Sequence, residues 1–229
     1  MSFEVDNYLF KSDKLLRDIS KTCYTQLKLI QQPITIKKGE VIYRQGDKPN
    51  GVYYLVEGKV KIEQSNKSGD IRVVYIYIDN EFFGFRTLMS EELQPVTAIA
   101  LEESKILFYR GEDFKRIVKA SPTLSLNMIE ILGFEFNMWV NLITALSHKS
   151  AKERIAFVLL LLHEKYKRSK RIKTEITLTK LDIGRYSETT EETVVRVLKF
   201  FEEQKFVKTQ GRTVSIINKR MLEIIAEEF

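Results

Sequence analysis

The segment TTEETVVRVLKFFEEQ, residues 189–204, combines an apolar stripe with polar residues spaced as on the outer face of a helix. Thr190 is placed to cap this helix, Thr193 follows three residues later, and negative charge in the first turn is favourable there. The segment holds no metal-ligand pattern, phosphate loop or catalytic triad, so its chemistry is recognition by hydrogen bonds and charge. With the stripe facing a core, the outward side carries Glu191, Glu192, Val195, Arg196 and Lys199.

The chain contains few residues of the types that bind metals or act as nucleophiles. Cys23 is the only cysteine, and His148 and His163 are the only histidines. The sequence HEKYK that begins at His163 departs from the H-E-x-x-H zinc motif, and one cysteine cannot build a disulfide framework or a four-cysteine cluster. We therefore expect no metal site, no cofactor and no catalytic residues.

The neighbouring segments predict a helix-turn-helix followed by a hairpin. LTKLDIGRY, residues 178–186, is typical of a helix capped by Thr179, and a very short join leads to the helix of residues 190–203. In this arrangement the N-terminal part of the second helix enters the DNA major groove. FVKTQGRTVSII, residues 206–217, predicts a hairpin wing centred on Gln210 and Gly211. The expected DNA contacts are Thr179, Arg185, Thr190, Glu191, Glu192, Thr193, Val195, Arg196, Lys199, Lys208 and Arg212.

The distribution of charge agrees with a polyanionic partner for the last third of the chain. Residues 1–147 contain 19 basic and 19 acidic side chains, whereas residues 148–229 contain 18 and 12, so the whole net charge of +6 lies in the second part. The run KYKRSKRIK, residues 165–173, has six basic residues and no acid. It is either a solvated loop or a contact with phosphates, and double-stranded DNA is the leading candidate partner.

The first half of the chain predicts a β-rich module. Residues 4–31 have apolar positions at helical spacing, and we expect a helix there. From Pro33 the apolar period changes to two, and glycines such as Gly39, Gly46 and Gly58 separate short β-branched and aromatic runs. Roughly six or seven such strands at short spacing indicate a small antiparallel roll or barrel.

Residues 123–147 predict a long helix with two apolar stripes. The first stripe is Leu124, Met128, Ile131, Met138, Leu142 and Ala145, and the second is Ile129, Phe136, Val140 and Ile143. A helix with two apolar faces needs two partners: one face can cover the roll and the other can pack on a second subunit. We expect the first stripe to form a homodimer, the alternative being a helix buried within one large domain.

Taken in order, these segments resemble the CRP/FNR family of bacterial transcription regulators. The resemblance covers roughly residues 10–220 and is carried by KKGEVIYRQGD, GVYYLVEGKVKI, EFFGF with TAIALEESKIL, and LTKLDIGRYSETTEETVVRVLKFFEEQKFV with GRTVSI. It implies an α+β chain with a β-roll sensor domain in residues 1–122, a dimerisation helix in 123–147 and a winged helix-turn-helix in 148–229. In the family, a Glu and an Arg one helical turn apart commonly read base edges, and these match Glu192 and Arg196.

The roll departs from the family members that bind cyclic AMP. Their Gly-Glu pair for the ribose and Arg-Ser pair for the phosphate align with Gly84-Phe85 and Gln94-Pro95. The phosphate would lose its arginine partner, so we expect no cyclic AMP binding. The cysteines of the oxygen-sensing iron–sulfur branch are also absent. The roll then holds either a nonpolar or unknown effector or no small-molecule effector at all. The residues around such a pocket would be Phe83, Gly84, Phe85, Arg86, Gln94, Pro95 and Val96.

The sequence thus predicts a cytoplasmic, homodimeric DNA-binding regulator rather than an enzyme. The N-terminus lacks the features of a secretory signal, and no membrane association is expected. The segment KRSKRIK, residues 167–173, lies where family members often contact RNA polymerase. Two alternatives are a signalling module whose C-terminal domain binds protein, and a cupin-like enzyme, which the lack of any histidine in residues 1–147 disfavours.

Overall fold

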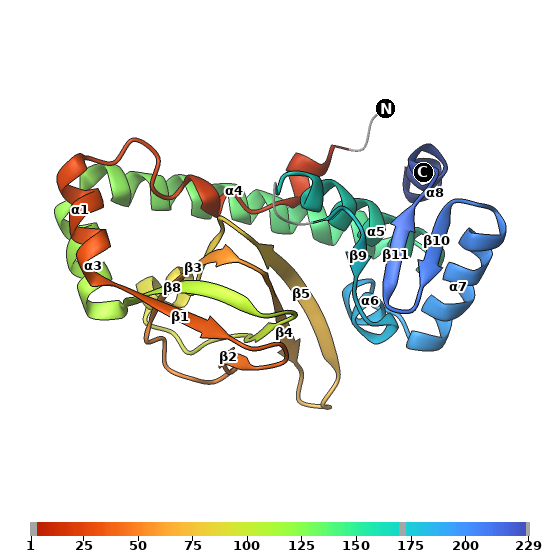
Figure 1. The fold of residues 1–229 in the computed structure, drawn as a ribbon, viewed down its shortest axis with the longest axis horizontal. Helices are drawn as coiled ribbons and strands as arrows, with labels where there is room; N and C mark the ends of the chain where they lie inside the picture. The colour runs from red at the N-terminus through yellow and green to blue at the C-terminus, as the bar shows by residue number, and fades with distance from the viewer. Residues whose placement is uncertain (1–3, 170–172, 228–229) are drawn as a thin grey trace. The chain divides into compact units, whose positions relative to one another are not determined.

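The computed structural model describes residues 4–169 and 173–227, which divide into two compact units (Figure 1). One unit comprises Phe10–Asn137, and the other comprises residues 4–9 together with residues 138–227. Helix α4, Pro122–Ser147, begins in the first unit and ends in the second. We describe each unit by itself.

The first unit is built around two four-stranded antiparallel sheets, ordered β1-β8-β3-β6 and β2-β7-β4-β5. The alternating apolar pattern from Pro33 onward places one side of each strand in the interior of this roll, and the predicted β-roll is confirmed. The strands are β1 Gln31–Ile36, β2 Val41–Tyr43, β3 Gly51–Glu57, β4 Lys59–Ser65, β5 Ile71–Ile78, β6 Phe82–Phe83, β7 Thr97–Ala100 and β8 Ser104–Arg110.

Aromatic rings fill the interior of the roll. The ring of Phe83 stacks on those of Tyr53 and Tyr77, with centroids 5.1 Å apart in both pairs. Gly84 follows with φ +83°, and a Cβ at this position would lie 2.9 Å from a ring carbon of Tyr53. Glycine is therefore required both for the backbone conformation and for the close approach.

The N-terminal segment differs from the helix predicted over residues 4–31. Asp18 adopts a positive φ of 55°, which interrupts a right-handed helix. The hydroxyl of Ser20 then accepts a hydrogen bond of 3.1 Å from the Cys23 amide and caps a new helix. Local capping thus overrides the helical spacing of apolar residues. The helical elements before α4 are the 3-10 turns η1 Val5–Tyr8 and η2 Ser12–Lys14, and the helices α1 Lys21–Ile30, α2 Phe85–Ser90 and α3 Gly111–Ala120.

The first apolar stripe of α4 is buried within the chain, so our assignment of it to a dimer contact is wrong. Leu124, Met128 and Ile131 belong to a core that α1 and α3 share. The roll and its helices present an apolar surface that covers this stripe. The second stripe stays exposed, because Ile129 is 65% exposed and Phe136 is 69% exposed. Met138 and Leu142 are also buried, Ala145 is half-buried, and Val140 and Ile143 are exposed.

Helix α4 is long and apolar enough to cross a membrane, the one such helix in the described residues, with a mean hydropathy of 1.2 over its best window. Composition alone is weak grounds for a membrane span. Its interior-facing residues pack on the roll, and its exposed side also carries Glu130 and Asn141.

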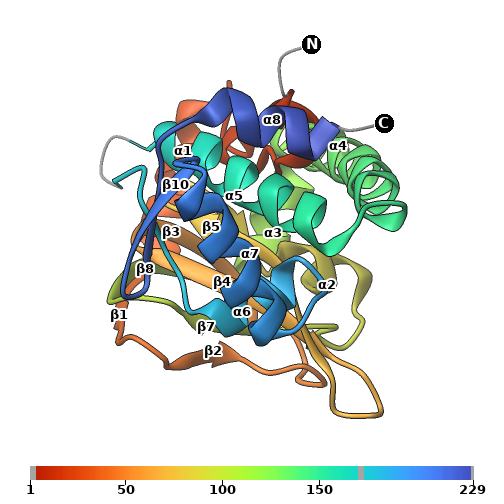
Figure 2. The same ribbon diagram turned by 90° about the vertical axis from the view of Figure 1, so that its right-hand side faces the viewer.

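The second unit contains a three-stranded sheet of order β10-β11-β9 and four further helices (Figure 2). Helix α5 begins with a capping box in which Ser150 and Glu153 bind each other's backbone amides. Neither β9 nor the C-terminal helix was predicted. The elements are α5 Ala151–Lys167, β9 Ile176–Thr177, α6 Lys180–Tyr186, α7 Glu191–Glu203, β10 Val207–Gln210, β11 Thr213–Ile216 and α8 Lys219–Glu227.

Candidate nucleic-acid interface

Helices α6 and α7 begin where the sequence places their caps. The hydroxyl of Thr179 accepts a hydrogen bond of 2.9 Å from the Asp182 amide, and that of Thr190 accepts one of 3.2 Å from the Thr193 amide. These bonds satisfy backbone N–H groups that lack partners inside a helix. The buried side chains that hold the two helices together are Ile183, Tyr186, Val194, Val197, Leu198 and Phe201.

The turn between the two helices depends on a glycine. The Thr189 amide donates a hydrogen bond of 2.9 Å to the Gly184 carbonyl, which brings the chain back over the end of α6. A Cβ on Gly184 would lie 2.8 Å from the Thr189 carbonyl oxygen. Any larger residue would push α7 away from α6 and change the angle at which α7 is presented.

Arg154 on α5 fixes this turn from the side, a role that the sequence did not reveal. Its guanidinium donates to the carbonyls of Ser187 at 2.7 Å and Glu188 at 3.0 Å, and also to the Lys149 carbonyl at 2.6 Å. Glu188 has a positive φ of 51°, and Arg154 stabilises that conformation by binding its carbonyl. The partners are backbone atoms, so no residue type or spacing in the sequence marks them.

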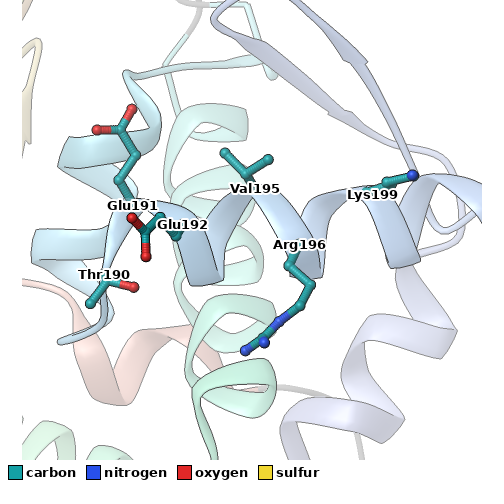
Figure 3. A pocket seen from close by; sticks show the side chains of 6 residues that line it. All are labelled: Thr190, Glu191, Glu192, Val195, Arg196 and Lys199. Atoms are coloured by element: carbon teal, nitrogen blue, oxygen red, sulfur yellow. The ribbon is translucent and has the colours of Figure 1, made fainter.

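The exposed face of α7 forms a shallow depression of mixed charge. Figure 3 shows the side chains of Glu192 and Arg196 on this face, one helical turn apart. Within the described residues, neither takes part in an ion pair or a side-chain hydrogen bond, so a mere surface salt bridge does not account for them. Their hydrogen-bonding groups are available to a ligand. The depression is lined by Thr190, Glu191, Glu192, Val195, Arg196 and Lys199.

The wing is the hairpin of β10 and β11, and two side chains attach it to the helices. Glu202 on α7 accepts hydrogen bonds from the amide and hydroxyl of Thr209, at 2.8 and 2.9 Å. These bonds hold the pKa of the Glu202 carboxyl below its ordinary value. Lys180 on α6 donates to the Gly211 carbonyl at 2.9 Å. The orientation of the wing therefore depends on both helices.

The hairpin turn lies one residue further along than predicted. Gln210 pairs with Thr213, so the loop consists of Gly211 and Arg212, and Gly211 has φ +60°. Arg212 is exposed at the tip and Lys208 is exposed on β10. Both are accessible to a ligand, whereas Thr179, Arg185 and Thr193 are half-buried.

The basic run of residues 165–173 lies only partly within the described residues, because positions 170–172 are outside them. Lys165 is buried and does not belong to an exposed patch. Arg168 pairs with Asp6 at 2.9 Å, and Lys167 pairs with Glu164 at 3.4 Å. In the described part of this run, the charges of Lys167 and Arg168 are thus paired with carboxylates of the second unit.

The residues expected around an effector in the roll differ in how far they are exposed. Phe83, Gly84 and Phe85 are buried, Val96 is half-buried and Pro95 is exposed. The buried Gln94 accepts a hydrogen bond of 3.0 Å from the Thr87 hydroxyl. The positions that hold the sugar and phosphate in members that bind cyclic AMP thus offer no charged partner.

Arg86 points inward, toward α4. Its guanidinium makes a two-pronged ion pair with Glu135, donates to the Tyr77 hydroxyl at 2.9 Å, and lies 4.5 Å from the ring centre of Phe10. Burial raises the pKa of the Tyr77 hydroxyl, which stays protonated. The guanidinium of Arg86 is therefore already paired with a carboxylate of the same chain.

The described residues contain no group of three or more His, Cys, Asp and Glu side chains that could hold an ion. Cys23 is a buried free cysteine on α1.

Two family models match this chain in succession: the cyclic nucleotide-binding domain over residues 33–121 and the Crp-like helix-turn-helix domain over residues 153–225. The transcriptional activator protein Anr of Pseudomonas protegens is 26% identical over 86% of this chain and 82% of its own length. The fumarate and nitrate reduction regulatory protein of Vibrio cholerae is also 26% identical, over 86% of this chain and 80% of its own.

Solved structures agree with this assignment at the level of the fold. FixK2 from Bradyrhizobium japonicum superposes with a TM-score of 0.74 at 20% identity, covering 86% of this chain and 97% of that one. The catabolite activator protein of Thermus thermophilus superposes with a TM-score of 0.53 at 24% identity, covering 93% of this chain and 97% of that one. With both domains in the family order and an accessible, capped helix in the helix-turn-helix, this chain is a DNA-binding transcriptional regulator of the CRP/FNR family.

Proposed function

We propose that the protein acts as a homodimer that reads a near-palindromic operator, with one copy of α7 in the major groove of each half-site. The observation that carries this proposal is the exposed, unpaired couple of Glu192 and Arg196 on a helix whose start is fixed by the Thr190 cap. Two-fold symmetry predicts half-sites about one helical turn, or 34–36 Å, apart.

Glu192 and Arg196 suit one G·C pair. An arginine donates in bidentate fashion to the O6 and N7 atoms of guanine, and a glutamate accepts from the N4 amino group of cytosine. Because the two residues are one helical turn apart, they face the same part of the groove. Around them, Lys199, Lys208 and Arg212 would bind phosphates, with Arg185 and the helix caps at Thr179 and Thr190 close to the DNA backbone.

The second apolar stripe of α4 is the dimer surface that the structure supports. Ile129, Phe136, Val140 and Ile143 are exposed and follow each other at spacings of seven, four and three residues. Exposed apolar residues at near-heptad spacing pack well against the same stripe of a second helix. The stripe of Leu124, by contrast, is already occupied by the roll.

DNA binding by this protein does not depend on cyclic AMP or on an iron–sulfur cluster in this proposal. Glu135 already neutralises Arg86, the buried Gln94 carries no charge, and one cysteine is too few for a cluster. A surface for RNA polymerase would include the exposed Lys167, Arg168 and Lys173. Like its relatives, the regulator would work in the cytoplasm.

The test is selection of bound sequences from random duplex DNA by the purified full chain, at one stated salt concentration, with and without cyclic AMP. We expect a palindromic motif with a G·C pair at matching positions of both half-sites, and the same motif and affinity in both samples. If sequences are enriched only when cyclic AMP is present, the proposal that DNA binding does not depend on cyclic AMP is wrong. Binding without sequence preference and without salt dependence would favour the signalling module that binds protein.

A further inference from the structure

The N-terminal segment, residues 4–17, has contacts in both units and is here called the strap. Its residues from Phe10 onward belong to the first unit. The Phe10 ring stacks on that of Tyr75, with centroids 3.9 Å apart, and the Phe10 amide donates to the Tyr75 hydroxyl at 3.0 Å. The Ser12 hydroxyl accepts a hydrogen bond of 3.1 Å from the Phe82 amide. This part of the strap is therefore fixed to strands of the roll.

The other part of the strap, residues 4–9, contacts two helices of the second unit. The Asn141 side chain on α4 donates to the Asn7 carbonyl at 3.2 Å. The ring of Tyr8 meets that of Phe157 on α5 edge to face, with centroids 4.9 Å apart. This part of the strap thus binds the last turns of α4 and the middle of α5 at once.

The chain between these two helices contains a joint. Helix α4 ends at Ser147 and α5 begins at Ala151, so residues 148–150 are not helical. Short segments at the ends of rigid elements are the places that absorb hinge motion. A contact on one helix alone leaves the angle of such a joint free, whereas contacts on both sides restrain it. The strap has contacts on both sides, because Asn141 precedes the joint and Phe157 follows it.

The angle of the joint matters for DNA binding because of what the two helices carry. Helix α4 carries the proposed dimer surface. Helix α5 carries Arg154, one turn before Phe157, and the guanidinium of Arg154 holds the turn that leads into α7. In a dimer, the two helices that enter the major groove must have the separation of the two half-sites. That separation therefore depends on the angle between α4 and α5.

We propose that the strap braces the joint between α4 and α5 and thereby fixes the spacing of half-sites that the dimer accepts. One end of the strap is held by the roll at Phe10 and Ser12, and the other end holds the two helices together at Asn7 and Tyr8. The strap is a second connection between the units besides α4. This inference rests on the proposed function, because the spacing of the operator is its readout.

The test measures Kd of the full-length protein for the selected operator and for two duplexes whose half-sites are one base pair closer or further apart. Tyr8→Ala removes the ring that contacts Phe157, so a smaller share of the molecules holds α7 at the required separation, and the apparent affinity falls with that share. We expect Kd for the selected operator to rise about fivefold. The preference for this operator over the other two duplexes should fall by a similar factor.

Three further variants serve as controls and as a second test. Tyr8→Phe keeps the ring and should retain the wild-type values. Tyr24→Ala removes a tyrosine that is 45% exposed on α1, and it should also bind like wild type. An insertion of Gly-Ser-Gly-Ser between Leu9 and Phe10 keeps every side chain but gives the strap slack. This insertion should reproduce the loss of spacing preference in Tyr8→Ala.

The opposite results would overturn the inference. A wild-type spacing preference in the insertion variant, or in folded Tyr8→Ala, would show that the strap does not set the spacing. An equal loss on all three duplexes would assign Tyr8 to folding, which circular dichroism would detect, and tighter operator binding would mean that the strap opposes the bound arrangement. These results differ from failure of the proposed function itself, in which no sequence is enriched for the wild-type protein.

Discussion

The guanidinium of Arg86 on α2 holds the carboxylate of Glu135 on α4 inside the first unit. Glu135 is 3% exposed, and Arg86 is enclosed further by the Tyr77 hydroxyl and the rings of Phe10 and Phe85. The pair connects α2 to the helix that carries the proposed dimer surface.

Removing Glu135 should destabilise the roll strongly. Glu135→Ala leaves the half-buried Arg86 charge, 28% exposed, without its partner. Since breaking a fully buried pair costs about 3–5 kcal/mol in the free energy of unfolding, we expect a loss near the lower end of that range. The double variant Arg86→Met with Glu135→Leu should recover most of this loss, because well-packed apolar residues replace buried ion pairs at little cost. Urea unfolding of the single and double variants measures both effects.

A second ion pair on α4 provides the matched control. Arg17 binds Glu130 at 2.9 Å, with side chains 51% and 43% exposed. An exposed pair is worth about 0–1 kcal/mol, so Glu130→Ala should have little effect on the urea midpoint. If Glu135→Ala and Glu130→Ala unfold at the same urea concentration, the Arg86 pair does not stabilise the roll.

Substitutions on the two faces of α4 should separate dimerisation from folding. Phe136→Glu places a charge on the exposed stripe and should yield a folded monomer with weak operator binding. Met138→Asp buries a charge in an apolar core and should unfold the chain instead. Light scattering together with circular dichroism distinguishes the two, and a folded Met138→Asp monomer beside an unaffected Phe136→Glu dimer would restore our first assignment.

The DNA-binding unit was predictable because its signals are local. Thr179 and Thr190 mark helix starts, Gly211 marks a tight turn, and the apolar spacing separates buried from outward residues within one short segment. Two features differ: the wing turn is shifted by one residue, and the C-terminal helix α8 was not predicted. The unpredicted strand β9 is two residues long and forms because β11 offers it an edge, which is a tertiary effect.

Long-range partners were not predictable from one sequence. Whether the Leu124 or the Phe136 stripe faces the roll depends on how α1 and α3 dock, since both stripes have suitable spacing. The partner of Arg86 lies 49 positions away, and nothing in the residues between them connects the two. The prediction of one helix over residues 4–31 was wrong for a local reason, because it gave the apolar spacing more weight than the cap at Ser20.

Arg154 should be required for DNA affinity although it lies behind the helix-turn-helix. Arg154→Ala removes the donors that bind the Ser187 and Glu188 carbonyls, a loss of roughly 2–3 kcal/mol for hydrogen bonds to a charged group. The turn can then relax and α7 lose its fixed orientation, so operator affinity should fall more than nonspecific affinity. Arg154→Lys, which keeps the charge without the fork of donors, should recover little. Full operator affinity in Arg154→Ala would assign it a role in stability alone.

Arg196 and Lys208 should affect DNA binding in different ways. Arg196→Ala should cost about 1–3 kcal/mol on the operator and relax the preference at one G·C pair, while most of the salt-dependent nonspecific affinity remains. Lys208→Ala, a change of the same size on the wing, should weaken binding to all sequences equally and reduce the slope of log K against log salt by about 1 per site. Titrations of operator and mutated operator at several salt concentrations separate the two patterns. An equal loss on every sequence in Arg196→Ala would identify Arg196 as a phosphate contact, because only a base contact distinguishes one duplex from another.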